Sequence, residues 1–280
     1  MNNKKIFIVL FLLVFFTNVS AQGNCSSFGY TVAAINGVFT NEQEAILNKE
    51  RLKQILPQFY NSEPINVDYL YNPTHIAGVG DLVDVINQGF FDSKTDFDLV
   101  EMLNDASLKI KTQKILLVGH SQGNFYANNF YDKVADKNGG VPSQSIGVYS
   151  VATPADRVAG NGGYLTSDTD KVISTLMGSI KNIMKPNNHI ELQDKNNNGH
   201  SFSDVYLRYS GNQIVSDIKY SLGKLSSNQI QNIQDLCISP QKISISHSIV
   251  KAVVSAADFV VNTIISIGSF ISNNIVNTAK

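Results

Sequence analysis

The chain has 280 residues, of which 43% are hydrophobic, and it carries 22 Lys and Arg against 23 Asp and Glu. This length and apolar content suit one large domain with a substantial core and argue against a disordered chain. The near-neutral balance provides no basic surface for nucleic acid, so we expect no nucleic-acid partner.

The first residues have the pattern of a secretory signal peptide. A basic pair, Lys4 and Lys5, precedes an apolar run over residues 6–16, and a small-residue triplet follows at residues 19–21. The run is short for a bilayer core of ~30 Å, and the small-residue end favours cleavage over anchoring. We therefore expect residues 1–21 to be a signal peptide and the mature protein to be exported, either secreted or periplasmic.

The two cysteines, Cys25 and Cys237, are predicted to form a disulfide. Export would place them in a compartment where disulfides persist, and the alternative is two buried free thiols. A zinc site built from paired Cys motifs is excluded, because the two cysteines lie so far apart in the sequence.

Short β-rich runs alternate with helical patterns between Gly29 and Leu225. This alternation predicts an α/β domain over residues 22–240, with a mostly parallel sheet and helices on both faces. The predicted strands cover residues 30–35, 65–71, 114–118, 146–151 and 164–167. The predicted helices cover residues 42–56, 82–89, 96–109, 122–135, 171–184 and 201–222.

The strongest local signal is Gly119-His120-Ser121-Gln122-Gly123, which follows an apolar strand and precedes a helical pattern. Gly-x-Ser-x-Gly in this context is a nucleophile elbow, a strained turn that exposes the serine hydroxyl. The two glycines permit close backbone packing, and the new helix directs its positive end at a developing oxyanion. Ser121 is the candidate nucleophile.

A serine hydroxyl needs a base, which an imidazole downstream can supply. Two of the five histidines, His189 and His200, follow Ser121 within the predicted domain. His200 is preferred because it follows an Asn-rich loop and directly precedes the last helical pattern, and His189 remains an alternative.

The carboxylate that orients the imidazole should follow a strand between the nucleophile and the base. Asp170 follows a strand and a short turn and stands at the start of a helical pattern, so it is the preferred acid. Asp156 is an alternative acid, which we expect to pair with its neighbour Arg157. Asp168 is a third candidate that can instead cap the helix.

The order Ser121, Asp170, His200, with Gly-His-Ser-Gln-Gly at the elbow, resembles the lipase and esterase branch of the α/β-hydrolase superfamily over residues 29–225. The resemblance implies the α/β-hydrolase fold and ester hydrolysis through an acyl-enzyme, without a metal or organic cofactor. A lipase-like substrate is the leading expectation, and a small-molecule esterase or thioesterase is the nearest rival. An inactive hydrolase-like protein that binds a membrane or a partner is the alternative from another class.

The resemblance also implies an oxyanion hole made by two backbone N–H groups. One belongs to Gln122, and the second comes from the loop after the first strand, where we nominate Val38. Lipases often have His-Gly in this loop, whereas this chain has Asn36-Gly37.

Residues 194–199 copy the first half of a calcium loop, Asp-x-Asn-x-Asn-Gly. The position that requires a bidentate Glu is Val205, so we expect no metal and interpret the run as the turn that delivers His200.

The C-terminal residues 241–280 differ from the rest. Polar residues recur with helical spacing from Lys251 to Asn277, and nearly everything between them is apolar. This pattern predicts an amphipathic helix over residues 248–276 that contacts a membrane surface or a hydrophobic partner, or packs against its own domain.

Overall fold

The computed structural model describes residues 25–37, 40–72, 94–194, 196–227 and 237–241. The predicted signal peptide, Val38, the predicted helix over residues 82–89 and the predicted C-terminal helix over residues 248–276 lie outside the described residues.

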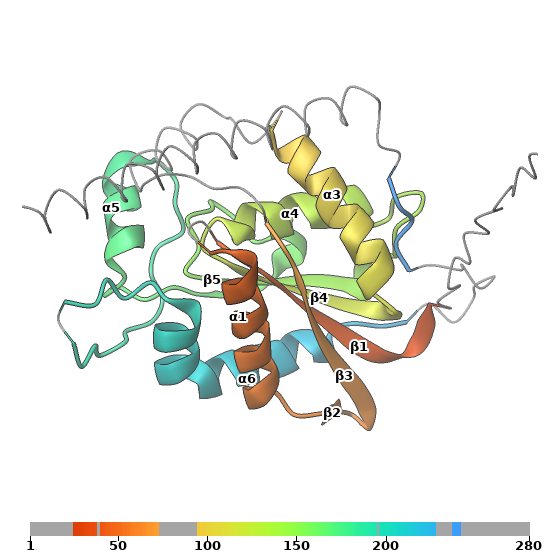
Figure 1. Ribbon diagram of the computed structural model, residues 1–280, viewed down its shortest axis with the longest axis horizontal. Helices are drawn as coiled ribbons and strands as arrows, with labels where there is room; N and C mark the ends of the chain where they lie inside the picture. The colour runs from red at the N-terminus through yellow and green to blue at the C-terminus, as the bar shows by residue number, and fades with distance from the viewer. Residues whose placement is uncertain (1–24, 38–39, 73–93, 195, 228–236, 242–280) are drawn as a thin grey trace, which may run out of the picture.

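The described residues form a six-stranded sheet with the strand order β2-β3-β1-β4-β5-β6 (Figure 1). Neighbouring strands are parallel except for β2 and β3. The predicted α/β class with a mostly parallel sheet is therefore confirmed, and the sequence reading missed only the short antiparallel strand β2. The strands are β1 (Ser26–Ile35), β2 (Phe59–Tyr60), β3 (Glu63–Leu70), β4 (Thr112–His120), β5 (Ile146–Val151) and β6 (Gly163–Leu165).

Helices lie on both faces of the sheet, with α3 and α4 on one face and α1 and α6 on the other (Figure 1). Two short 3-10 turns flank β5, and a π-helical turn, η3, leads into α6. The bounds are α1 (Glu42–Ile55), α3 (Lys94–Lys109), α4 (Gly123–Val134), η1 (Ser143–Ser145), η2 (Ala159–Asn161), α5 (Lys171–Ser179), η3 (Phe202–Leu207) and α6 (Arg208–Gly223).

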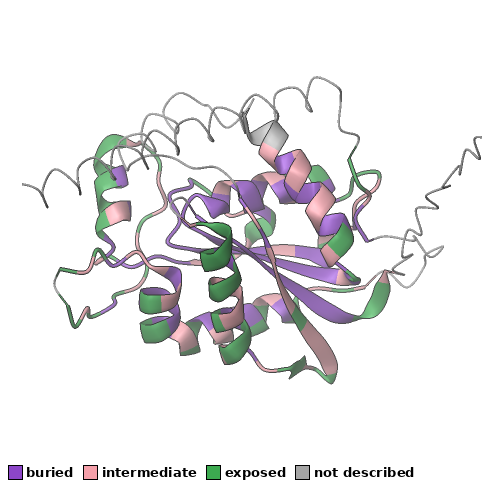
Figure 2. Ribbon diagram, in the orientation of Figure 1, coloured by how far each residue is buried: buried purple, intermediate pink, exposed green. Residues whose placement is uncertain are grey.

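The central strands are buried on both faces, which explains their continuous apolar sequence. In β4, Leu116 and Val118 pack on the α1 and α6 side, whereas Ile115 and Leu117 pack on the α3 and α4 side. Figure 2 shows the buried strands between the two helical layers. This placement puts the carboxyl end of β4 in the middle of the sheet.

Two predicted helices differ from the observed ones. The helix expected over residues 171–184 ends at Ser179, because the following chain turns back and the Met184 N–H donates to the Ala155 carbonyl. The helix expected over residues 201–222 consists of η3 and α6, with non-helical backbone angles at Ser210.

Cys25 and Cys237 form the predicted disulfide. Cys237 is buried in the core on the α3 and α4 side, so the bridge ties the start of β1 to the segment at residues 237–241. The described residues hold no free cysteine, which excludes the alternative of two free thiols. A structural disulfide is compatible with an oxidising compartment.

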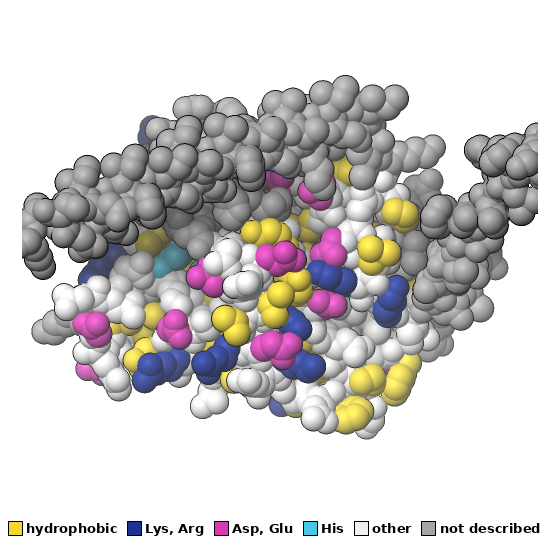
Figure 3. All heavy atoms as spheres, in the orientation of Figure 1, with side chains coloured by type: hydrophobic (Ala, Val, Ile, Leu, Met, Phe, Trp, Pro, Cys, Tyr) yellow, Lys and Arg dark blue, Asp and Glu magenta, His cyan; other side chains and the backbone are white. Residues whose placement is uncertain are grey.

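The distribution of charge on the surface and the hydropathy of the helices can also be described. On the face drawn in Figure 3, Lys and Arg side chains lie interspersed with Asp and Glu. Of the helices in the described part of the chain, none is long and apolar enough to cross a membrane.

Candidate functional site

Ser121 occupies the sharp turn between β4 and α4. Its φ of 55° lies in the left-handed region, which is costly for a residue other than glycine. The flanking glycines leave room for this turn: a Cβ at Gly119 would lie 2.6 Å from the Asn124 Oδ1, and one at Gly123 would lie 2.4 Å from the Ile35 carbonyl oxygen. The local sequence thus forms the elbow expected of Gly-x-Ser-x-Gly.

Three side chains predicted from sequence form one hydrogen-bonded line. The His200 Nε2 lies 2.8 Å from the Ser121 Oγ, and the His200 Nδ1 lies 2.8 Å from the Asp170 Oδ2. Because a carboxylate can only accept, Nδ1 carries the proton, which leaves Nε2 free to accept from the serine hydroxyl. Asp170 is fully buried and the His200 side chain is 12% exposed.

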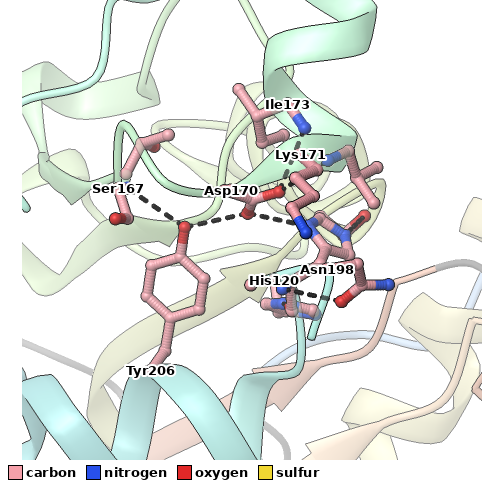
Figure 4. Close-up of polar contacts among 12 residues, drawn as sticks. His120, Ser167, Asp170, Lys171, Ile173, Asn198 and Tyr206 are labelled. Atoms are coloured by element: carbon pink, nitrogen blue, oxygen red, sulfur yellow. Dashed lines mark hydrogen bonds and ion pairs between the residues drawn. The ribbon is translucent and has the colours of Figure 1, made fainter. Parts of the chain in front are cut away.

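Asp170 is held by the start of α5 as well as by the imidazole. Its Oδ1 accepts from the backbone N–H groups of Val172 at 3.0 Å and Ile173 at 3.1 Å (Figure 4). The residue is therefore the N-cap of α5, where the positive end of the helix favours a carboxylate. These two capping bonds orient the carboxylate independently of its bond to His200.

Tyr206 was missed by sequence reasoning, although it completes the environment of the acid. Its hydroxyl donates to the Asp170 Oδ2 at 2.9 Å and accepts from the Ser167 N–H at 3.1 Å (Figure 4). Burial, and secondarily the nearby Asp170 charge, raise the pKa of Tyr206, so the phenol stays a donor. The residue lies on η3, where the N–H groups of Val205 and Tyr206 both donate to the Ser201 carbonyl. No local signal in the sequence marks this contact.

His120, the residue before the nucleophile, holds the backbone of the base. Its Nε2 lies 2.8 Å from the His200 carbonyl oxygen, and the two imidazole rings are 5.0 Å apart. Burial first, and the neighbouring His200 second, lower the pKa of His120 to about 3. The ring is therefore neutral at physiological pH and donates through Nε2–H. Sequence reasoning treated it only as part of the elbow.

The Asn-rich loop delivers His200, as predicted. The Lys171 N–H donates to the Asn198 carbonyl at 2.9 Å, and the Asn198 Oδ1 accepts from the His200 N–H at 3.0 Å. Gly199 adopts a φ of 76°, and a Cβ there would lie 2.7 Å from the Thr169 carbonyl oxygen. The loop is thus attached to the start of α5, next to the acid.

The alternative base and the third candidate acid bind each other instead of Ser121. The His189 Nδ1 lies 2.8 Å from the Asp168 Oδ1, and the two side chains are 67% and 57% exposed. They form a surface pair apart from the line of Ser121, His200 and Asp170.

The alternative acid Asp156 is exposed, and the structure gives it no bond to His200. Its expected pairing with Arg157 is wrong, since Arg157 forms an ion pair with Asp132 of α4. The Arg157 side chain is long, so its guanidinium reaches Asp132 on the neighbouring helix more easily than it reaches the carboxylate of the adjacent Asp156.

Of the two nominated oxyanion donors, only Gln122 lies in the described part of the chain. It stands at the N-cap of α4 with its side chain fully buried. The loop with the other nominee, Val38, is described as far as Gly37, which packs against the nucleophile: a Cβ there would lie 2.5 Å from the Ser121 Cβ. Within the described residues, no group of three or more His, Cys, Asp or Glu side chains could hold a metal ion.

The sequence matches no protein-family model, and no curated protein matches it.

Proposed function

We propose that this protein is an exported serine hydrolase with the α/β-hydrolase fold, which cleaves carboxylic esters through an acyl-enzyme. The observation that carries the proposal is the line of hydrogen bonds from Ser121 through His200 to Asp170, at 2.8 Å and 2.8 Å. A hydroxyl, an imidazole and a buried carboxylate in this order are the parts that activate a serine.

The proposed reaction begins when the Ser121 Oγ attacks the ester carbonyl carbon while the His200 Nε2 takes the hydroxyl proton. The oxyanion accepts a hydrogen bond from the Gln122 N–H and from a second backbone donor, for which Val38 remains the prediction. The imidazolium, stabilised by Asp170, then gives its proton to the leaving alkoxide, and the alcohol departs.

The second half of the reaction releases the acid. His200 takes a proton from a water molecule that attacks the acyl-enzyme, and the imidazolium returns the proton to the Ser121 Oγ as the carboxylic acid leaves. The chemistry requires no metal or organic cofactor, because the chain supplies nucleophile, base and oxyanion donors.

The leading substrate class is a lipid ester, and a small ester or thioester is the alternative. This choice rests on the resemblance of the elbow to those of lipases and on the apolar C-terminal sequence. Export rests on the N-terminal sequence pattern, with which the disulfide between Cys25 and Cys237 is compatible.

The test is labelling with a fluorophosphonate probe, followed by peptide mapping and an ester hydrolysis assay. We expect the label on Ser121, and we expect Ser121→Ala and His200→Ala to lose on the order of 10³-fold or more in kcat because they act as one unit. Asp170→Asn should also lose strongly, because the wrong histidine tautomer forms.

The chain offers matched controls for the base and the acid. His189→Ala and Asp168→Asn change a histidine–carboxylate pair with the same 2.8 Å distance on the surface. The first removes the imidazole and the second neutralises the carboxylate, and both should leave hydrolysis unchanged. A label on another serine, full activity in Ser121→Ala, or a larger loss in Asp156→Asn than in Asp170→Asn would contradict the assignment. An unlabelled, inactive wild-type protein would favour the hydrolase-like binding protein instead.

A further inference from the structure

Three buried amide side chains form a connected network beside the elbow. Asn36 follows β1, Asn72 follows β3, and Gln122 precedes α4, with 6%, 1% and 0% of each residue exposed. The Asn72 Nδ2 donates to the Gln122 Oε1 at 3.0 Å. The network therefore joins the ends of two strands to the residue that follows the nucleophile.

Asn36 and Asn72 bind each other through two bonds. The Asn72 N–H donates to the Asn36 Oδ1 at 2.7 Å, and the Asn36 Nδ2 donates to the Asn72 carbonyl at 3.1 Å. The orientation of the Asn36 amide is fixed by chemistry, since a reversed amide would place its oxygen against a carbonyl.

The same Asn36 amide holds the loop that contacts the nucleophile. Its Nδ2 also donates to the Gly37 carbonyl at 3.1 Å. Gly37 lies so close to Ser121 that an added Cβ would be 3.1 Å from the Ser121 Oγ. Asn36 thus holds the carbonyl of the glycine that packs against the nucleophile.

We propose that Asn36 and Asn72 are positioning residues that hold the Gly37 backbone and the oxyanion donor Gln122 in place beside the Ser121 Oγ, an inference that rests on the proposed function. Asn36 holds the carbonyl of Gly37, whose backbone packs against the nucleophile. The Gln122 N–H, the proposed oxyanion donor, belongs to the residue whose side chain Asn72 holds.

The proposal gives a function to the residue that departs from the lipase pattern. Where lipases often have His-Gly, Asn36 provides one acceptor and two donors in a short side chain, and each of these groups has a backbone partner here. Oxyanion stabilisation depends on donors placed within tenths of an ångström, so the loss of this amide should weaken catalysis without removing a catalytic group.

The test compares an ester with the matching thionoester, in which sulfur replaces the carbonyl oxygen. Sulfur accepts hydrogen bonds weakly, so a well-placed oxyanion hole favours the ester, whereas the serine, histidine and aspartate act on both substrates. We expect Asn36→Ala to lower kcat for the ester by about 10- to 100-fold and the ester-to-thionoester rate ratio by about tenfold. KM should change little.

A milder variant covers the case in which Asn36→Ala does not fold. Asn72→Ala removes the side-chain bond to Gln122 and keeps the two bonds between the Asn36 side chain and the Asn72 backbone, so it should lower the same ratio by a smaller factor.

Asn128→Ala is the matched control. Asn128 is a buried asparagine on α4 whose Nδ2 donates to the Arg157 carbonyl at 3.0 Å and whose Oδ1 accepts from the Ala159 N–H at 2.8 Å. This variant breaks the same kinds of bond away from Ser121, so it should leave the ratio at the wild-type value.

The outcomes separate the two proposals. If the probe labels Ser121 but the ratio in Asn36→Ala and Asn72→Ala equals that of Asn128→Ala, the positioning role is wrong and the proposed function stands. If the wild-type protein neither reacts with the probe nor hydrolyses the ester, the proposed function fails and this inference fails with it.

Discussion

Acid should destabilise this protein through His120. The pKa of this buried imidazole is lowered from 6.5 to about 3 in the folded protein. Below pH 6.5 the unfolded chain therefore binds a proton that the folded protein does not, and the free energy of unfolding falls by about 1.4 kcal/mol per pH unit. The stabilisation is complete above pH 6.5 and is lost progressively toward pH 3. At about pH 5 the loss reaches ~2 kcal/mol, a substantial share of the ~5 to 15 kcal/mol of a typical domain.

The variant that isolates this effect is His120→Gln. Its side-chain amide can donate to the His200 carbonyl in place of the Nε2–H, but it does not titrate. Urea unfolding of both proteins between about pH 7.5 and about pH 4.5 should show a shallower pH dependence for the variant, by about one proton. Parallel slopes for wild type and His120→Gln would refute the reasoning.

Two further predictions concern the acid and the disulfide. Tyr206→Phe removes a donor from the Asp170 Oδ2 and the acceptor of the buried Ser167 N–H, so urea unfolding should show a loss of about 2 to 4 kcal/mol. Its kcat/KM for an ester should fall about tenfold, and an unchanged value would show that the phenol does not position the acid. Replacing both Cys25 and Cys237 by Ser should cost about 3 to 5 kcal/mol in the same assay, because the bridge closes a loop with a sequence separation of 212. A cost below ~1 kcal/mol would show that the unfolded chain gains little freedom without the bridge.

Local patterns in the sequence were sufficient to predict the parallel strands and the elbow. A strand buried on both faces is continuously apolar, so β4 and β5 were evident, and Gly-x-Ser-x-Gly marked Ser121. The proximity of Asp170 and His200 to Ser121 could be anticipated because each follows a turn signal in the expected chain order.

The contacts that sequence reasoning missed are those between distant residues. Tyr206, on the π-helical turn η3, bonds Asp170 across a sequence separation of 36. The pairing of Asn36 with Asn72 depends on two strand ends being neighbours in the sheet. The two-residue strand β2 was too short to show a period. The Arg157 partner was wrong because a side chain that long can reach several carboxylates.

The hydrogen bond from the His120 side chain to the His200 carbonyl limits how the His200 imidazole can turn relative to the Ser121 hydroxyl. Ser121 and His200 are joined by their side chains, and the residue before Ser121 is joined to the main chain of His200. One hydrogen bond allows two segments to rotate about it, whereas two bonds along different directions do not. The rotational freedom of the imidazole relative to the hydroxyl is thus lost when the chain folds, and the entropy of bringing them together does not have to be supplied when a substrate binds.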